Sequence, residues 1–218
     1  MLGFSLDILF KNIIEILPLM KNYFFMLFLL ISSLIWSQDA TRIQYQKDNF
    51  ESAKEILKYG DNVLSIRRFL LTASIVPKSE IAQIAIKKTD SIKLIIRNNK
   101  INQLIGNWKW IPQDANWVIR DDGLVGKMIT INPTEILFFE LYKKSKKWEL
   151  VKKEILHFSE KPELYSFTEL VYSNKEIWDY TINKESGELN AFYIGEENEW
   201  GFSQWVCGQL EFHYFKLE

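Results

Sequence analysis

The sequence predicts an α+β protein in which a helical segment precedes an antiparallel β-barrel of eight or nine strands. Apolar residues recur at helical spacing between residues 41 and 103. From residue 104 onward, short runs rich in β-branched and aromatic residues alternate with polar turns, which is typical of an antiparallel meander. An apolar segment precedes both. We therefore divide the chain into an amino-terminal segment, residues 1–37, a helical segment, 38–103, and a strand-rich segment, 104–218.

The amino-terminal segment has the form of an export signal. Met20-Lys21-Asn22 is a basic start, an apolar stretch follows as far as Trp36, and Ser37 is a small residue at a suitable cleavage point. We expect cleavage after Ser37 and export to the periplasm, the outer-membrane periphery or the extracellular space. A retained anchor is the alternative, although the stretch is shorter than the roughly 20 residues that span a bilayer. Residues 1–19 precede a complete signal, so we expect Met20 to be the true start.

Composition argues against several kinds of site. Lys and Arg (27) nearly balance Asp and Glu (28), whereas a nucleic-acid-binding domain is normally basic. One cysteine, Cys207, and two histidines, His157 and His213, cannot assemble a Cys/His zinc site within one chain. Both histidines alternate with charged residues, so we expect them on the surface. No phosphate loop or nucleotide fingerprint occurs, and we expect no metal and no cofactor.

Three helices are expected in the segment 38–103. Asp48-Asn49-Phe50-Glu51 has the form of a capping box that starts the first helix. Asp61 or Asn62 is suited to cap the second helix, and Ser79 the third. Asn98-Asn99-Lys100 is the expected end of the third helix. The simplest role for these helices is a layer that buries its apolar face against the barrel.

The strand-rich segment is expected to form the barrel. The expected strands are 104–111, 116–120, 124–131, 135–142, 148–158, 164–172, 176–183, 189–194 and 209–217. Short polar turns join them, and in Asp121-Asp122-Gly123 the glycine stands where a positive φ is required. A barrel of about eight strands has room inside only for side chains or for one small ligand.

Two short motifs in this segment resemble those of lipocalins and lipocalin-like domains. Gly106-Asn107-Trp108 matches the Gly-x-Trp of the first strand, whose Trp packs across the closed end of the barrel in that family. Asp179 and Tyr180 match two residues of the family's Thr-Asp-Tyr motif, with Trp178 in place of the Thr. The family also has a late Arg that stacks on the motif Trp, and here only Lys216 stands there. The resemblance covers about half of the chain and implies a ligand-holding barrel.

Aromatic side chains are the candidate ligand-binding residues: Trp110, Trp117, Phe138, Phe167, Trp178, Tyr180 and Tyr193. Strand alternation places Phe167, Trp178 and Tyr180 on one face. Trp117 belongs to a loop that would cover one end of the barrel. If these rings surround an open interior, they form an apolar pocket for a small lipophilic molecule. If they interdigitate, they are the packed core of a filled barrel.

The leading functional hypothesis is therefore an exported lipocalin-like protein that binds a small lipophilic molecule. The alternative is a non-catalytic structural or interaction module with a filled barrel and an envelope protein as partner. The charge distribution motivates it, because residues 41–103 hold twelve basic and six acidic residues, whereas residues 104–218 hold thirteen and nineteen. A secreted enzyme is the third hypothesis, and no catalytic constellation supports it. We expect no nucleic-acid partner and membrane association only through the signal peptide.

Overall fold

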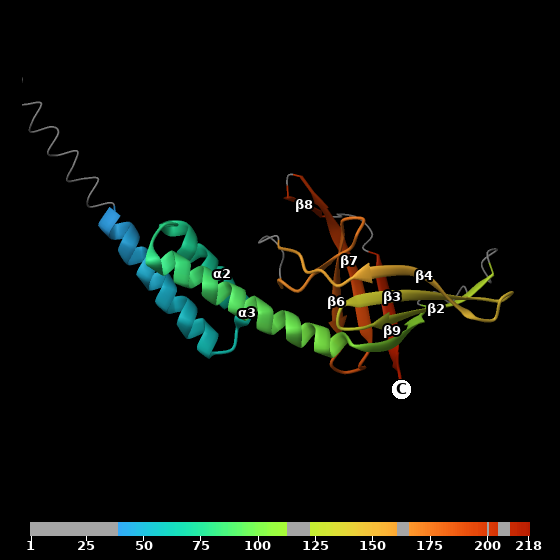
Figure 1. Ribbon diagram of the computed structural model, residues 1–218. Coiled ribbons are helices and arrows are strands. Elements are labelled where there is room, and N and C mark those ends of the chain that lie inside the picture. The colour runs from blue at the N-terminus through green and yellow to red at the C-terminus, as the bar shows by residue number, and fades with distance from the viewer. Residues whose placement is uncertain (1–38, 113–122, 161–165, 200, 205–209) are drawn as a thin grey trace, which may run out of the picture. The chain divides into compact units, whose positions relative to one another are not determined.

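The computed structural model describes residues 39–112, 123–160, 166–199, 201–204 and 210–218 (Figure 1). These residues form three helices and nine antiparallel strands, so the α+β class is confirmed. The predicted signal segment, the expected strand 116–120, Trp117 and Cys207 lie outside the described residues. The chain forms two compact units. A helical unit contains residues up to 60 together with 67–88, and a sheet unit contains residues 61–66 and 89–218.

The first helix differs from the sequence-based expectation at its start. Residues 39–58 are all helical, so the predicted capping box at Asp48 is wrong. The Asp48 carboxylate instead accepts a hydrogen bond from Gln44 Nε2 one turn earlier, at 2.8 Å. Polar residues on the inner face of this helix are used for tertiary contacts. Gln46 is fully buried and its amide nitrogen donates to the Thr72 carbonyl oxygen at 2.8 Å.

The next two helices, α2 (Asn62–Ile75) and α3 (Glu80–Leu104), begin where the sequence predicts. Asp61 accepts a hydrogen bond from the Leu64 amide at 2.9 Å, and Ser79 Oγ accepts one from the Ala82 amide at 3.0 Å. Both are N-cap interactions that satisfy amides at a helix start. The predicted end of the third helix near residue 100 is wrong, because α3 continues to Leu104.

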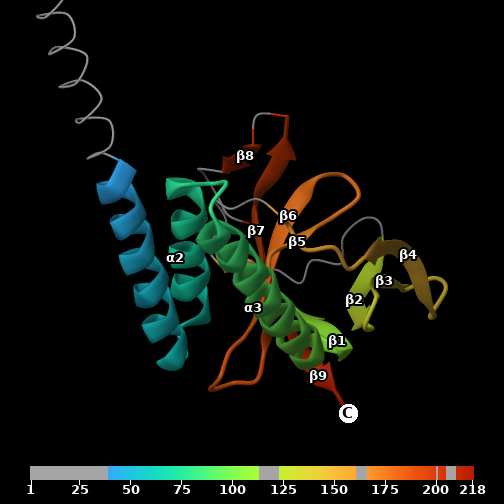
Figure 2. The same ribbon diagram turned by 60° about the vertical axis from the view of Figure 1, so that its left-hand side comes forward.

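The strands form a single antiparallel sheet (Figure 2). They are β1 (Gly106–Ile111), β2 (Leu124–Ile131), β3 (Glu135–Tyr142), β4 (Trp148–Ile155), β5 (Leu170–Val171), β6 (Glu176–Ile182), β7 (Leu189–Asn198), β8 (Gly201–Gln204) and β9 (Glu211–Leu217). Their order is β4-β3-β2-β1-β9-β7-β6-β5, with β8 paired to β7. Sequential neighbours thus pair as hairpins, and β9 returns to lie between β1 and β7.

The expected strand 164–172 is largely wrong, and the reason lies at Phe167. This residue has a φ of +61°, a left-handed conformation that interrupts an extended strand. Only Leu170 and Val171 remain as β5. The segment after β4 nevertheless contacts β5, since the Val171 amide donates to the His157 carbonyl at 2.8 Å and Phe158 forms a bridge with Leu170.

Trp108 belongs to the buried core of the sheet unit. The Trp108 side chain is only 1 % exposed, and its indole N–H donates to the Leu104 carbonyl oxygen at 2.8 Å. That bond satisfies one of the carbonyls left unpaired at the end of α3. The neighbouring core residues are Leu104, Ile129, Ile131, Ile136 and Leu189. Trp108 therefore couples the end of α3 to the inner face of the sheet.

The glycine of the Gly-x-Trp motif has a steric role. Gly106 has a φ of +145°, and a Cβ atom at this position would lie 2.8 Å from Cε of Lys216. Lys216 pairs with Trp108 across β1 and β9, and its ammonium lies 5.2 Å from the centroid of the Trp108 ring. The missing side chain at Gly106 thus leaves room for Lys216 to cross the indole, a cation–π arrangement.

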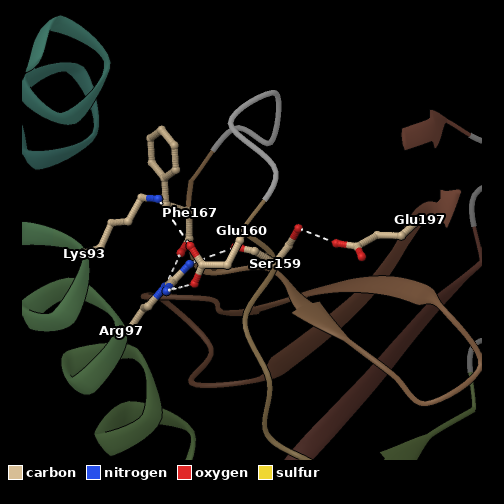
Figure 3. A network of polar contacts seen from close by, with 6 residues as sticks. All are labelled: Lys93, Arg97, Ser159, Glu160, Phe167 and Glu197. Atoms are coloured by element: carbon tan, nitrogen blue, oxygen red, sulfur yellow. Dashed lines mark hydrogen bonds and ion pairs between the residues drawn. The ribbon is translucent and has the colours of Figure 1, made fainter. Parts of the chain in front are cut away.

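A polar network links the second half of α3 to the segment between β4 and β5 (Figure 3). The Arg97 guanidinium donates to the carbonyl oxygens of Phe167 at 3.0 Å and Ser159 at 2.8 Å, and to the Glu160 carboxylate at 2.6 Å. Ser159 Oγ donates in turn to Glu197 at 2.7 Å. One arginine thus satisfies two backbone carbonyls of a segment that has little regular structure of its own.

Candidate ligand-binding site

The sheet unit contains a cavity of about 210 Å³ on the inner side of the sheet. The residues that line it come from β2, β3, β4, β6, β7 and β9 together with Tyr172: Lys127, Met128, Ile129, Phe138, Phe139, Glu140, Val151, Lys152, Tyr172, Glu176, Trp178, Tyr180, Ala191, Phe212 and Tyr214. Trp108 is not among these residues.

Aromatic rings form much of the cavity wall. Trp178 is stacked between Tyr172 and Phe212, with ring centroids 5.8 Å and 5.9 Å away. Phe138 meets Tyr172 edge to face at 5.9 Å. These rings come from β3, β6 and β9 and from Tyr172, which directly follows β5. The result is a wall of flat apolar surfaces that suits an apolar or aromatic molecule.

Three tyrosines, Tyr172, Tyr180 and Tyr214, add hydroxyl groups to this wall. The hydroxyls of Tyr172 and Tyr180 are hydrogen-bonded to each other. Burial raises the pKa of all three tyrosines above the ordinary value. The hydroxyls are therefore protonated at neutral pH and act as hydrogen-bond donors.

The charged groups of the cavity are already paired within the protein. Lys127 Nζ lies 3.6 Å from the Glu140 carboxylate, and Lys152 Nζ lies 2.9 Å from that of Glu154. Glu176 accepts a hydrogen bond from the indole of Trp178 at 3.1 Å. The lining itself contains two lysines and two glutamates, so the cavity carries no large excess of either charge.

Glu154, which pairs with the lining residue Lys152, is buried, with 2 % exposure. Burial acts to raise the pKa of Glu154, but hydrogen bonds from the Ser173 amide and hydroxyl and the ammonium of Lys152 outweigh it and hold the pKa below its ordinary value. The two Ser173 contacts are 2.8 Å and 3.0 Å long. The carboxylate therefore connects β4 to the turn that follows β5.

Glu154→Gln is expected to lower the free energy of unfolding at pH 7 by about 1–2 kcal/mol, because it removes a charge-assisted acceptor. A lowered folded-state pKa stabilises the protein above the unfolded-state pKa, about 4.3, and this contribution is lost as the pH falls through the folded-state value. The difference between wild type and variant should thus shrink towards zero at acid pH. Urea denaturation across this pH range measures it. Glu149→Gln, at an exposed position of the same strand, is the matched control, and an equal loss there would contradict the assignment.

The predicted site residues divide into four groups. Phe138, Trp178 and Tyr180 line the cavity. Trp110 and Tyr193 pack against the surrounding core without lining it, and Tyr193 lies 5.5 Å from the Trp178 ring. Phe167 is buried outside the cavity, with its ring 5.5 Å from Lys93 Nζ. Trp117 lies outside the described residues.

Several lining residues were not anticipated from the sequence, above all Tyr172, Ala191, Phe212 and Tyr214. Phe212 and Tyr214 are two positions apart in β9, so strand alternation places their side chains on the same face of the sheet. This spacing was the signal in the sequence that could have identified them. The sequence alone could not identify Ala191 as a lining residue, because a small residue can be assigned to the inner face only when the register of its strand is known.

The histidines and carboxylates are the described groups that could act in catalysis or bind a metal. No cluster of three or more His, Cys, Asp or Glu side chains suitable for a metal ion occurs among the described residues. His157 is exposed, as expected. The expectation of a surface position is wrong for His213, whose side chain is only 19 % exposed and whose Nε2 lies 2.7 Å from the Glu211 carboxylate. Within the described residues, no helix combines the length and apolar character needed to span a bilayer.

No protein-family model matches the chain, and no curated protein or solved structure is similar enough to count as a match. The fold and the site define an α+β protein whose antiparallel sheet carries an aromatic cavity.

Proposed function

We propose that the protein is an exported, lipocalin-like binding protein that holds a small lipophilic molecule in the cavity of its sheet unit. The cavity with its aromatic wall is the observation that carries this proposal. The contact of Lys216 with Trp108 supports the resemblance to lipocalins, because it supplies a cation where the family has its stacking arginine.

The proposal includes closure of the sheet into a barrel. The two terminal strands in the sheet order are β4 and β5. Three contacts between the segment after β4 and the β5 region support closure: Val171 N to His157 O at 2.8 Å, Ser159 N to Glu169 O at 2.9 Å, and the Phe158–Leu170 bridge. Closure also satisfies strand edges that would otherwise be open to other chains.

The size of the cavity restricts the ligand. An apolar cavity of about 150 Å³ is large enough to bind benzene, and the cavity here is about 210 Å³. It suits a molecule with one ring or a short branched chain, whereas a long acyl chain requires more space. Ligand sites in proteins commonly have about 300–1,000 Å³, so this cavity is smaller than the common range and suits only a small molecule.

Filling the cavity from within is the direct test. Ala191 lines the cavity and is 1 % exposed, so Ala191→Leu places three additional carbons where the ligand would lie. We expect wild type to bind the single-ring hydrocarbon α-methylstyrene saturably, and Ala191→Leu to weaken binding at least about tenfold, since it removes most of the buried apolar contact. Ligand-detected NMR titration of the purified protein measures both.

The control is Thr181→Leu, which adds a large side chain to the opposite face of β6 next to Tyr180. It should leave binding unchanged. The proposal fails if wild type shows no saturable binding, or if the Ala191 and Thr181 variants bind equally well. Native mass spectrometry of the exported protein would then identify any ligand class that co-purifies.

An interaction module with a filled barrel remains the second candidate. The observation that favours it is the apolar character of the terminal strand β4, where Leu150 is 56 % and Ile155 71 % exposed. Terminal strands with exposed apolar side chains are sites where other chains pair. Absence of saturable binding in the titration would support this candidate.

A further inference from the structure

Tyr214 is a buried hydrogen-bond donor in the cavity wall. Its side chain is 5 % exposed and lines the cavity together with Tyr172 and Tyr180. Tyr172 and Tyr180 bond to each other. The Tyr214 hydroxyl has no hydrogen-bond partner among the described residues, and it is not one of the fully buried side-chain atoms that lack a partner, so it keeps some accessible surface. A hydroxyl in a cavity wall that has no acceptor in the protein bonds to water or to a bound molecule.

The Tyr172–Tyr180 pair adds a second unused proton. A hydroxyl pair shares one hydrogen bond, in which one oxygen donates and the other accepts. The proton of the accepting hydroxyl then still needs an acceptor of its own. The wall thus offers two donors, and burial keeps both in the protonated form by raising the pKa of these tyrosines.

The same cavity offers little to a charged ligand. Lys127 and Lys152, its two cations, already lie beside the carboxylates of Glu140 and Glu154. An anionic ligand would have to displace these carboxylates or remain beside them, and either change weakens existing charge pairs. An uncharged acceptor on an apolar body fits both the aromatic wall and the unused hydroxyls.

We propose that the ligand of this cavity is a neutral, single-ring-sized molecule that carries a carbonyl or ether oxygen, and that this oxygen accepts a hydrogen bond from Tyr214. The inference rests on the proposed function and adds the chemical class of the ligand. Tyr214 is the specificity-determining residue of the site. The aromatic wall formed by Trp178 and its stacked neighbours Tyr172 and Phe212 holds the apolar body.

Three probes of nearly equal size test this assignment: acetophenone, α-methylstyrene and benzoate. They place a neutral carbonyl oxygen, a methylene group or a carboxylate on the same phenyl ring. Wild type should prefer acetophenone over α-methylstyrene by about fivefold, the typical net value of one hydrogen bond. In Tyr214→Phe most of this preference should be lost, because only the donor of the Tyr172–Tyr180 pair remains, while affinity for α-methylstyrene stays within about twofold. Ligand-detected NMR titration supplies all of these affinities.

Tyr193→Phe is the matched control, because its hydroxyl donates to Glu196 at 3.1 Å and does not line the cavity. That variant should keep the preference for acetophenone. Retained binding of α-methylstyrene by Tyr214→Phe also shows that the variant is folded.

Each contrary result has a distinct meaning. Equal binding of acetophenone and α-methylstyrene by wild type, or an unchanged preference in Tyr214→Phe, overturns the assignment and leaves the proposed binding function standing. Tightest binding of benzoate overturns the neutral-ligand assignment in favour of an anionic ligand. Failure of all three probes to bind wild type overturns the proposed function and this inference with it.

Discussion

Replacing Trp108 with alanine is expected to lower the free energy of unfolding by about 3–5 kcal/mol, the usual range for a buried aromatic residue. The Trp108 ring is 1 % exposed and packs among residues of α3, β2, β3 and β7. Its removal leaves a cavity and also leaves the Leu104 carbonyl without the indole donor that lies 2.8 Å away. Cavity formation and loss of this bond act in the same direction.

Chemical denaturation followed by far-UV circular dichroism measures this loss, because the signal does not depend on the deleted indole. Trp148→Ala is the control, since Trp148 is 37 % exposed near the start of the terminal strand β4. It should cost about 1 kcal/mol or less, as is usual for substitutions near the surface. Similar losses in both variants would contradict the central position of Trp108 in the core.

Arg97→Met is expected to cost about 2–4 kcal/mol. The Arg97 side chain is 14 % exposed, and it donates to two backbone carbonyls and one carboxylate. Hydrogen bonds that involve a charged group contribute about 1.5–3 kcal/mol each, although the contributions within one network do not add. Methionine keeps much of the apolar stem, so the loss reports mainly the guanidinium and the carbonyls of Ser159 and Phe167 that it leaves unpaired.

Lys93→Met provides the comparison for Arg97. Lys93 contacts the same carboxylate, at 3.4 Å, but the Glu160 side chain is 64 % exposed. An ion pair with an exposed partner is worth about 1 kcal/mol or less. Hydrogen exchange should show faster opening at the amides of Ser159 and Val171 in Arg97→Met and little change in Lys93→Met. Equal effects of the two substitutions would assign the stabilisation to charge alone.

The strands were predicted well from the sequence wherever the turn residues and the alternation of apolar residues indicate the same strand bounds. The bounds of β2 and β3 are those expected, and Gly123 has the positive φ of +73° that its turn requires. Alternation also placed Trp178 and Tyr180 on the inner face. These features depend on residues close together in the chain, so a single sequence is sufficient to predict them.

Features that depend on distant partners were predicted poorly. The strand ending at Ile194 in the prediction continues through Gly195 to Asn198 and pairs with the unexpected β8. A Cβ atom at Gly195 would lie 2.1 Å from the carbonyl oxygen of Ser203, so this glycine permits close strand pairing, although it resembles a turn residue in the sequence. The left-handed Phe167 is likewise buried beside Arg97 and Lys93, two residues about seventy positions earlier in the chain.

The prediction of ligand-binding residues was limited in the same way, because it also depends on distant parts of the chain. The aromatic residue type identified Phe138, Trp178 and Tyr180, but it also selected Trp110 and Tyr193, which pack against the core. Whether an inward ring faces a hollow or a neighbour depends on the register between strands and on small residues such as Ala191. Neither is visible in a list of aromatic positions.

The position of β9 between β1 and β7 sets the order in which the sheet can fold. Trp108 in β1 pairs with Lys216 in β9, about a hundred residues later in the chain. Joining such distant segments requires closure of a long loop before the contacts can stabilise it, which slows folding. On a ribosome, β1 and β7 therefore each lack one neighbour until β9 has been synthesised. During that interval the nascent chain exposes two unpaired strand edges, the state in which association with another chain is easiest.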